Sequence, residues 1–248
     1  MAKIRITKKG KELMKKTKLA EIVIISIILF IGLSIFVNKI ITSIQDNKRY
    51  EELQKEKENV DNELKKNIDI KLYPTKNNEI IAKVNNSNSV PVSVIIEVLF
   101  YDKGDIFIDK GTCYALKVAP NHVVYEEVFL VPEKYDHYYY TYTANTTFSD
   151  IYEFENIDIK TEKQEKQLII YLTNNSDEKI RYIKGVVLYF LNDEIVYYDS
   201  IYESKLEPGE TKEETSYNPF KYDRSDYTTI PIEYDSYIIH INESYVDE

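Results

Sequence analysis

The sequence is poor in the residues that build most metal, cofactor and phosphate sites. Its 248 residues include one cysteine, three histidines, six glycines and no tryptophan. A single cysteine excludes an internal disulfide framework and a cysteine-based zinc cluster. Six glycines leave no glycine-rich phosphate loop. The net charge is −10, whereas nucleic-acid binders carry a basic footprint. We therefore predict no metal site, no cofactor and no nucleic-acid partner.

The first 44 residues differ in composition from the rest of the chain. Residues 1–18 hold eight Lys and Arg and one acid, and residues 22–37 carry no charge. A stretch of this length is typical of a membrane-spanning helix. We predict a basic cytoplasmic tail at 1–18 and a single transmembrane helix in the lipid bilayer at 19–44. The alternative is a cleaved signal peptide, although no clear small-x-small site follows the apolar run.

The distribution of charge indicates where the remaining residues lie. Residues 1–44 carry nine Lys and Arg against two acids, a net charge of +7, so residues 45–248 carry −17 of the total of −10. Because positive segments stay on the cytoplasmic side, we expect the N-terminus in the cytoplasm and the C-terminal domains outside it, at the cell membrane. The simplest reason for the acidity is solubility.

Residues 45–66 contain no glycine or proline and are highly charged, which predicts a helical stalk. Tyr50, Leu53, Val60 and Leu64 follow coiled-coil spacing, but Lys57 interrupts the apolar stripe. Two interpretations stay open. The stalk is either a solvated spacer or a short coil that forms a weak homodimer.

An internal repeat divides residues 67–155 from residues 156–248. The sequence Asn-Ile-Asp-Ile-Lys at 67–71 recurs at 156–160. Further matches follow in the same order at offsets of 87–89 positions: Val84–Ser87 with Leu172–Ser176, Leu99–Ile106 with Leu188–Ile195, Val118–Asn121 with Leu206–Gly209, and Pro132–Tyr140 with Pro219–Tyr227. We predict two tandem modules.

Each module is predicted to be all-β. Between Val92 and Tyr101 apolar residues alternate along the chain with a period of two, as in a half-buried strand. Residues 102–105 and 191–194 are predicted hairpin turns, the first because Gly104 tolerates positive φ. Pro120 and Pro208 are predicted to break the following strands. Short strands spaced over about 90 residues favour a β-sandwich.

These motifs carry a family resemblance. The Asn-Ser loop, the strand ending Leu99-Phe100-Tyr101-Asp102, the glycine turn and the later Pro208-Gly209 resemble FxLYD-type immunoglobulin-like domains of bacterial surface proteins. The second module departs from the pattern, since Leu191 stands where the first has Asp102. The resemblance implies two tandem immunoglobulin-like β-sandwiches, an extracytoplasmic setting and no catalytic activity.

Candidate catalytic residues are few. Cys113 and His122 are a Cys–His pair close in sequence, which invites a transpeptidase of the sortase class. However, the motif Thr-Leu-x-Thr-Cys of that class is absent, and the repeat places Cys113 opposite Ile201 or Tyr202 as an ordinary strand residue. No nucleophile elbow is present. We predict that the protein is not an enzyme.

The densest aromatic run lies at residues 135–142. Tyr138 and Tyr139 face Ser225 and Asp226 in the repeat match, so they are not kept as aromatics in both copies. We therefore predict that any ligand-binding surface uses Tyr138 and Tyr139, because exposed rings stack on sugars.

The sequence predicts a stiff rod of two modules that binds or scaffolds a protein partner in the membrane or cell envelope, by surface matching or strand addition. The alternative function is a cell-wall glycan-binding surface protein.

Overall fold

The computed structural model describes residues 39, 42, 45, 48–52, 54–55, 57–147, 152–223 and 228–246. The predicted tail at 1–18 and, apart from Lys39 and Thr42, the predicted membrane helix at 19–44 lie outside these residues. No helix in the described part of the chain is long and apolar enough to cross a membrane. The chain divides into two compact units, residues 1–58 and 59–248. In the first unit every described residue from 39 to 58 is helical, as the stalk prediction requires.

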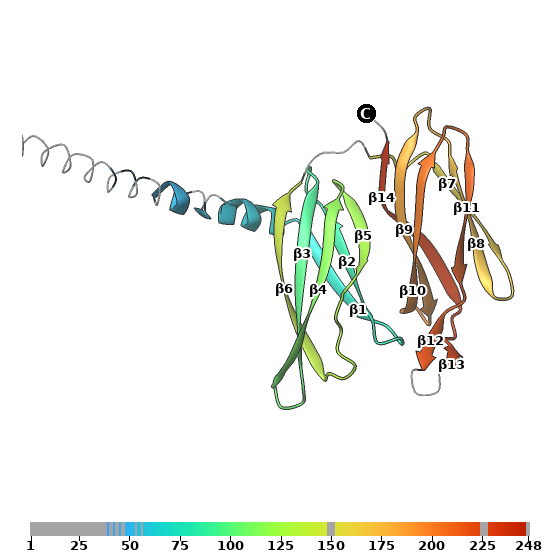
Figure 1. Cartoon of the computed structure of the whole chain (residues 1–248), viewed down its shortest axis with the longest axis horizontal. Coiled ribbons are helices and arrows are strands. Elements are labelled where there is room, and N and C mark those ends of the chain that lie inside the picture. Colours follow the sequence, from blue (N-terminus) through green and yellow to red (C-terminus); the bar gives the residue numbers. More distant parts are fainter. Residues whose placement is uncertain are drawn as a thin grey trace, which may run out of the picture. The chain divides into compact units, whose positions relative to one another are not determined.

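The second unit is predominantly β, as predicted (Figure 1). Its described residues form fourteen strands: β1 (Ile68–Pro74), β2 (Ile80–Asn86), β3 (Val92–Tyr101), β4 (Phe107–Val118), β5 (His122–Glu127), β6 (His137–Thr146), β7 (Ile157–Lys163), β8 (Gln167–Asn174), β9 (Ile180–Leu191), β10 (Glu194–Leu206), β11 (Thr211–Tyr217), β12 (Phe220–Asp223), β13 (Thr228–Pro231) and β14 (Ser236–Val246).

Two pairs of facing sheets enclose separate hydrophobic cores. In the first module, residues 59–147, sheets β1-β2-β5 and β4-β3-β6 surround a core that includes Ile80, Ile96 and Phe100. In the second module, residues 152–246, sheets β10-β9-β14 and β11-β8-β7 surround a core that includes Ile170 and Tyr189. Strands β12 and β13 form a separate hairpin. All of the paired strands are antiparallel.

The end of the helix is fixed to the first module. Leu64 is buried in the first core, and its carbonyl oxygen accepts a hydrogen bond of 3.2 Å from Asn88 Nδ2. One turn earlier, Asp61 Oδ1 accepts a hydrogen bond from the Ala144 amide on the free edge of β6. Tyr142 Oη donates to the Lys65 carbonyl at 3.3 Å. The hydrogen bonds from Asn88 and Tyr142 satisfy two carbonyl groups that a helix C-terminus leaves without partners.

The repeat is reproduced in three dimensions. Asn86 and Asn174 are both fully buried at the ends of β2 and β8. Asn86 Nδ2 donates to the carbonyls of Val90, Val118 and Ala119 at 3.0 Å each. Asn174 Nδ2 likewise donates to two carbonyls of its own module. In each module a buried asparagine therefore joins two turns across the sandwich.

The structure corrects the last repeat match. Pro219–Tyr227 is not the counterpart of Pro132–Tyr140, because the β12–β13 hairpin is inserted at that point in the second module. Two hydrogen bonds establish the true correspondence. Asp136 N donates to the Tyr101 carbonyl and Asp235 N donates to the Phe190 carbonyl, both at 2.8 Å. Pro132-x-x-Tyr-Asp-x-Tyr138 therefore corresponds to Pro231-x-x-Tyr-Asp-x-Tyr237.

An aromatic trio confirms this correspondence. In the first module the ring of Phe100 lies 4.9 Å from that of Tyr135 and 6.3 Å from that of Tyr138. In the second module Tyr189 lies 4.9 Å from Tyr234 and 6.3 Å from Tyr237. These distances join ring centroids, and the spacing favours edge-to-face attraction. These tyrosines therefore serve the fold in both modules.

The predicted turns are present, but in the first of them the residue with positive φ differs from the predicted one. Asp105, not Gly104, has the positive φ in the β3–β4 turn. Asp102 Oδ1 closes the turn by accepting from the amides of Gly104 and Ile106. Asn121 and Gly209, which follow the two turn prolines, both adopt positive φ. Equivalent positions thus use different residues for the same left-handed conformation.

Strand β9 differs from its counterpart β3 in that both of its faces are covered. Buried residues alternate with more exposed ones along β3. In β9 all residues from Gly185 to Tyr189 are buried. One face of β9 lines the second core, and the other lies against the first module. The two modules therefore pack against each other through their sheets.

We predict that Asn86→Ala destabilises the protein by about 3 kcal/mol, because three carbonyls lose their donor and two of these hydrogen bonds are buried. Urea unfolding measured by circular dichroism checks this. The matched control is Asn85→Ala, since Asn85 is only partly buried and its side chain makes one 3.4 Å hydrogen bond, to Ser87. Equal losses in the two variants would contradict the assigned role.

Candidate binding surfaces

The structure does not bring the Cys–His pair together. Cys113 lies opposite Ile96 in the first core and is fully buried. Burial, with the nearby Glu126, raises the pKa of its thiol to about 12, which is the opposite of what a nucleophile needs. His122 instead points to the second module, where its Nε2 lies 2.8 Å from the Ile241 carbonyl oxygen. Ile201 corresponds to Cys113 and is also buried, in agreement with an ordinary strand position.

No group of three His, Cys, Asp or Glu residues in the described ranges is placed to hold a metal ion. Two glutamates in the acid-rich stretch at residues 203–214 form ion pairs with lysines. Glu203 pairs with Lys212 at 3.0 Å and Glu207 with Lys179 at 2.5 Å. The absence of a metal or cofactor in function stays a prediction.

Tyr138 and Tyr139 lie on opposite faces of β6. Tyr138 pairs with the buried Phe100 and packs against the first core. Tyr139 pairs with Leu99 and is 63% exposed. The two rings therefore cannot form one surface, and only Tyr139 is available to a partner.

Tyr139 belongs to an exposed aromatic cluster that the sequence did not reveal. Its ring lies 5.7 Å from that of Tyr101 and 5.5 Å from that of His137. Tyr101 in turn stacks on His137 at 5.6 Å and meets Phe107 at 6.0 Å. Asp105 Oδ1 lies 3.2 Å from His137 Nε2, although the geometry does not make a hydrogen bond. The cluster lies where β3, β4 and β6 approach the β3–β4 turn.

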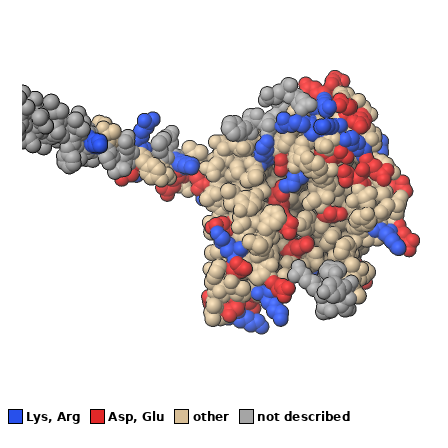
Figure 2. Space-filling model, viewed as in Figure 1, with Lys and Arg blue, Asp and Glu red and all other residues tan. Residues whose placement is uncertain are grey.

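Exposed apolar side chains concentrate around this cluster. Of the seventeen large exposed hydrophobic residues in the described part of the chain, nine fall between residues 106 and 140: Ile106, Phe107, Ile108, Tyr114, Leu116, Phe129, Leu130, Tyr139 and Tyr140. In the view of Figure 2, the surface over β6 and β3 consists mostly of residues other than Lys, Arg, Asp and Glu. On one face of the β4-β3-β6 sheet, the exposed Phe107, Tyr114 and Tyr139 alternate with Thr112, Thr141, Thr143 and the Glu97–Lys110 pair.

We call the solvent side of the β4-β3-β6 sheet the outer face. Its side chains follow from the strand pairing. Ile95 lies opposite Tyr114, Leu99 lies between Lys110 and Tyr139, and Tyr101 lies between Phe107 and His137. Charge at its centre comes from Glu97 and Lys110, whose side chains form a 2.6 Å ion pair.

The corresponding face of the second module is buried in the module interface. Val186 and Leu188 of β9, with Ile195 of β10, pack against Ile81 of β2. Tyr73 and Tyr125 from the first module, and Phe190 and Tyr198 from the second, surround this apolar cluster. Sheet β1-β2-β5 of the first module therefore covers one face of sheet β10-β9-β14. The equivalent face of sheet β4-β3-β6 is exposed to solvent.

Polar contacts fix the alignment of the two modules. Asn242 Oδ1 accepts from the Tyr125 amide at 3.0 Å, and Asn242 Nδ2 donates to the Tyr125 carbonyl at 2.6 Å. Lys184 Nζ lies 2.6 and 2.7 Å from the two carboxylate oxygens of Glu126. The Lys76 amide donates to the Val196 carbonyl at 3.2 Å. Because these bonds need particular donors and acceptors, they specify one register of the two sheets.

Two histidines cross the interface in opposite directions. His122 Nε2 donates to the Ile241 carbonyl, and His240 Nε2 donates to the Val123 carbonyl at 2.6 Å. Their rings stack with centroids 5.4 Å apart. Burial lowers the pKa of both side chains, and the neighbouring His240 lowers that of His122 further. The interface therefore favours neutral histidines.

Glu79 is a partly buried carboxylate at the edge of the module interface. It lies in the β1–β2 turn, where Asn77 Nδ2 donates to its Oε1 at 2.9 Å, but its buried Oε2 has no hydrogen-bond partner. Burial and the nearby Glu127 raise the pKa of Glu79 to about 7. Glu127 also forms a hydrogen bond with Tyr198 of the second module. Burial is the main cause of the raised pKa of Tyr198, and Glu127 raises that pKa further.

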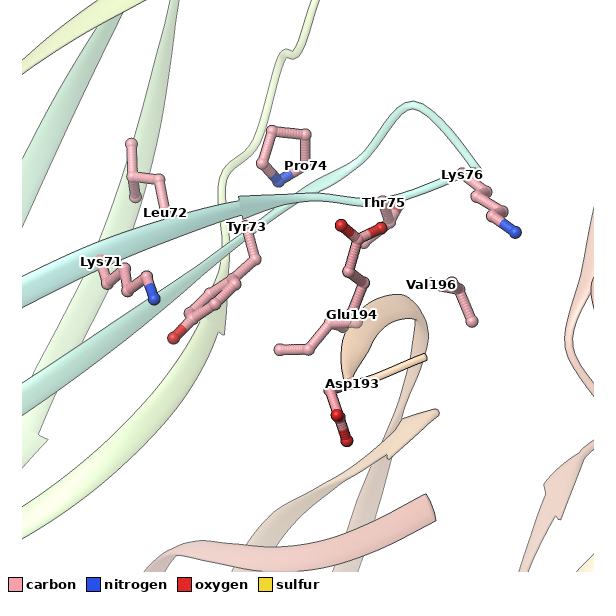
Figure 3. A pocket seen from close by; sticks show the side chains of 10 residues that line it. Lys71, Leu72, Tyr73, Pro74, Thr75, Lys76, Asp193, Glu194 and Val196 are labelled. Atoms are coloured by element: carbon pink, nitrogen blue, oxygen red, sulfur yellow. The ribbon is translucent and has the colours of Figure 1, made fainter. Parts of the chain in front are cut away.

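A groove of about 470 Å³ opens beside this point (Figure 3). Residues 71–76 of the first module form one wall, and the β9–β10 turn with the start of β10, residues 193–196, forms the other. Lys71 and Tyr73 extend to one side of β1, and Leu72 and Pro74 extend to the other. A second hollow of about 450 Å³ is lined by Lys117, Arg181, Glu243 and three tyrosines. Lys117 Nζ lies 4.8 Å from the ring centroid of Tyr245.

No protein-family model matches the chain. No curated protein matches it either. Among solved structures, the crystal structure of red sea bream transglutaminase is similar at 10% identity with a TM-score of 0.19. The match covers 61% of this chain and 29% of that chain. A TM-score this low carries no argument about fold or activity.

We predict that Glu79→Gln stabilises the protein at pH 8 by about 1 kcal/mol, a figure reduced for the partial exposure of the carboxylate. The pKa of Glu79 is about 7 in the folded protein against an ordinary value of 4.5. The carboxylate therefore costs stability as the pH rises from about 4.5 to about 7, and the glutamine removes that cost. Thermal unfolding of both proteins between pH 4 and pH 8 measures the difference.

Glu194→Gln is the matched control, because Glu194 is an exposed carboxylate on the opposite wall of the same groove. It should leave the pH profile of stability unchanged. If the stability of the Glu79→Gln variant changes with pH in parallel with that of the unmodified protein, the ionised carboxylate of Glu79 does not cost stability.

Proposed function

We propose that this chain is a membrane-anchored, non-catalytic scaffold of the bacterial cell envelope that binds a protein partner outside the cytoplasm. Two tandem immunoglobulin-like β-sandwiches of FxLYD type follow the proposed transmembrane helix at 19–44 and the stalk. The observation that carries the proposal is the group of exposed aromatic side chains, Phe107, Tyr114 and Tyr139, on one face of the β4-β3-β6 sheet.

The rigidity of the second unit supports a scaffolding role. The apolar cluster and the polar contacts between the two modules restrict the motion of one module relative to the other. Contacts from residues 61–65 attach the helix end to the first core. A surface held in this way keeps its orientation, which reduces the entropy lost when a partner binds.

A non-catalytic role agrees with the placement of the candidate nucleophile. The thiol of Cys113 is enclosed in the first core with a raised pKa, and His122 is engaged by a carbonyl of the second module. A hydrolase or transferase needs its nucleophile and base within hydrogen-bond reach of each other.

Glycan binding is the second candidate function. It is favoured by Tyr139, whose exposed ring lies with Tyr101, His137 and Phe107 at one end of the sheet. Tyr138, which we paired with Tyr139 from the sequence, belongs to the core and has no part in this candidate site.

We predict that a tagged full-length chain is extracted from membranes only by detergent, that external protease removes its C-terminal modules from intact spheroplasts, and that a stoichiometric protein copurifies after in-cell crosslinking. A chain found in the soluble fraction, or protected from external protease, would contradict the membrane topology.

The partner arm has its own control. Retention of the purified protein on isolated cell wall, without a copurifying protein, would favour the glycan alternative. Copurification that persists equally after the crosslinker is omitted and the salt is raised would indicate a stable complex rather than a transient contact. A stable complex and a transient complex with a protein are both compatible with a scaffold, whereas binding to the cell wall without a protein partner is not.

A further inference from the structure

Two histidines from different modules lie face to face across the module interface. His122 belongs to β5 of the first module and His240 to β14 of the second, and their rings stack with centroids 5.4 Å apart. Both side chains are partly buried. Histidine is the side chain whose ordinary pKa places its change of charge between pH 5 and pH 8. Two of the three histidines in the chain therefore meet at one contact between the modules.

Hydrogen bonds define the protonation state of this histidine pair. His122 Nε2 lies 2.8 Å from the Ile241 carbonyl oxygen, and His240 Nε2 lies 2.6 Å from the Val123 carbonyl oxygen. Because a carbonyl oxygen only accepts, each Nε2 carries a proton, and an additional proton must go to Nδ1. Each neutral ring therefore reaches into the opposite module, and a proton added to both rings turns the contact into one between two cations.

The charged groups around the pair give little compensation for added positive charge. Lys83 on β2 is itself a cation and lowers the pKa of His240. The nearby carboxylates on β5, on β14 and in the segment that precedes β7 already have partners: Glu126 with Lys184 of β9, Glu243 with Tyr245, and Glu153 with Asn156. A charged histidine pair would therefore have no free carboxylate among these residues with which to pair.

The aromatic neighbours distinguish the first added proton from the second. Phe154 stacks on His122 at 4.0 Å, and Tyr125 meets His240 edge-on at 5.2 Å, both measured between ring centroids. A cation on an aromatic face is attracted to the ring, so Phe154 favours one charge at His122. The second proton places like charges 5.4 Å apart, which disfavours it. Burial lowers the pKa of both histidines and outweighs their backbone hydrogen bonds.

We propose that acidification uncouples the two modules, because charging His122 and His240 breaks the contact between β5 and β14. The inference concerns regulation of the second unit and goes beyond the proposed scaffold function, and it does not depend on where the chain lies in the cell. The sign follows from linkage. Both histidines have a pKa below the ordinary value of 6.5 in the folded protein. Their stabilisation of the interface is complete above about pH 6.5 and is lost as the pH falls below it.

Two carboxylates of the same interface respond to pH in the opposite direction. Burial raises the pKa of Glu79 to about 7 and also raises the pKa of Glu126. Their protonation on acidification therefore adds stability. The pH profile of one protein alone would mix the two effects. The double variant His122→Gln, His240→Gln separates them, because glutamine offers a neutral N–H donor at each position and leaves both carboxylates in place.

Two backbone amides report directly on the contact between the modules. The Tyr125 amide donates to Asn242 Oδ1 at 3.0 Å, and the Lys76 amide donates to the Val196 carbonyl at 3.2 Å. Hydrogen exchange of these amides is measured by NMR on the full-length chain in detergent micelles and corrected for the intrinsic effect of pH. We expect their protection to fall about 10-fold between pH 7.5 and pH 5.5, while amides within β3 stay protected.

The variants then assign this loss to the histidine pair. In the His122→Gln, His240→Gln protein, the Tyr125 and Lys76 amides should keep their protection at pH 5.5. The matched control is His137→Gln, because His137 lies on β6 with Tyr101 and Tyr139 and makes its contacts within the first module. This control should lose protection at the two amides as the unmodified protein does. Circular dichroism melting at pH 7.5 shows whether each variant folds.

Three outcomes would overturn the inference. The first is unchanged protection of the Tyr125 and Lys76 amides in the unmodified protein at pH 5.5. The second is an equal loss in the double glutamine variant. The third is an equal loss at the amides of β3, since this would show unfolding of the first module instead of separation. If the double variant does not fold, the ring signals of His122 and His240 replace it. Protonation of both rings without loss of Tyr125 protection would also overturn the inference.

Discussion

The burial of β9 on both faces is the constraint on which the arrangement of the second unit depends. From Gly185 to Tyr189 no side chain of this strand reaches solvent to any substantial extent. Val187 and Tyr189 fill the second core, and Val186 and Leu188 fill the module interface. A single strand therefore links two hydrophobic clusters, so a change that shifts its register would disturb both. Its counterpart β3 carries one core only.

This arrangement explains why buried polar groups gather at the module interface. Sheet faces that meet through apolar contact alone could slide past each other, since the hydrophobic effect has no direction. Asn242 and the Lys184–Glu126 pair do have direction, and they fix one alignment. The cost of that specificity is visible in the raised pKa of Glu126, where burial outweighs the neighbouring lysine. Conformational specificity at some cost in stability is a known use of buried ion pairs.

Much of the fold could be predicted from the sequence because local signals agree with the final structure. The alternation in β3 and the turns at Pro120 and Pro208 appear where they were predicted. The asparagines Asn86 and Asn174 were expected in polar loops and are instead fully buried. The last repeat match failed because the inserted hairpin carries its own Pro-x-Lys-Tyr-Asp sequence, which imitates the true Pro-x-x-Tyr-Asp segment farther along. Sequence similarity without the strand pairing could not distinguish the two.

The candidate surface was harder to find, although one signal was available. Tyr138 and Tyr139 are consecutive residues of a strand, so the period of two should have placed them on opposite faces. The aromatic cluster around Tyr139 joins β3, β4 and β6, and no local pattern brings Tyr101, Phe107 and His137 together. The module interface was also missed. Its sequence trace is the unbroken apolar run in β9, which is typical of a strand covered on both sides.

The repeat allows equivalent sheet faces of the two modules to be compared. Two modules with a common ancestor pattern start with equivalent faces, and selection for solubility alone would make an uncovered face polar. On β7-β8-β11 this has happened, since Glu162 and Glu213 occupy positions at which the equivalent sheet has tyrosines. On β4-β3-β6 it has happened in part: Glu97 and Lys110 occupy the positions of Val186 and Tyr198, whereas Phe107 and Tyr139 are aromatic and more than half exposed.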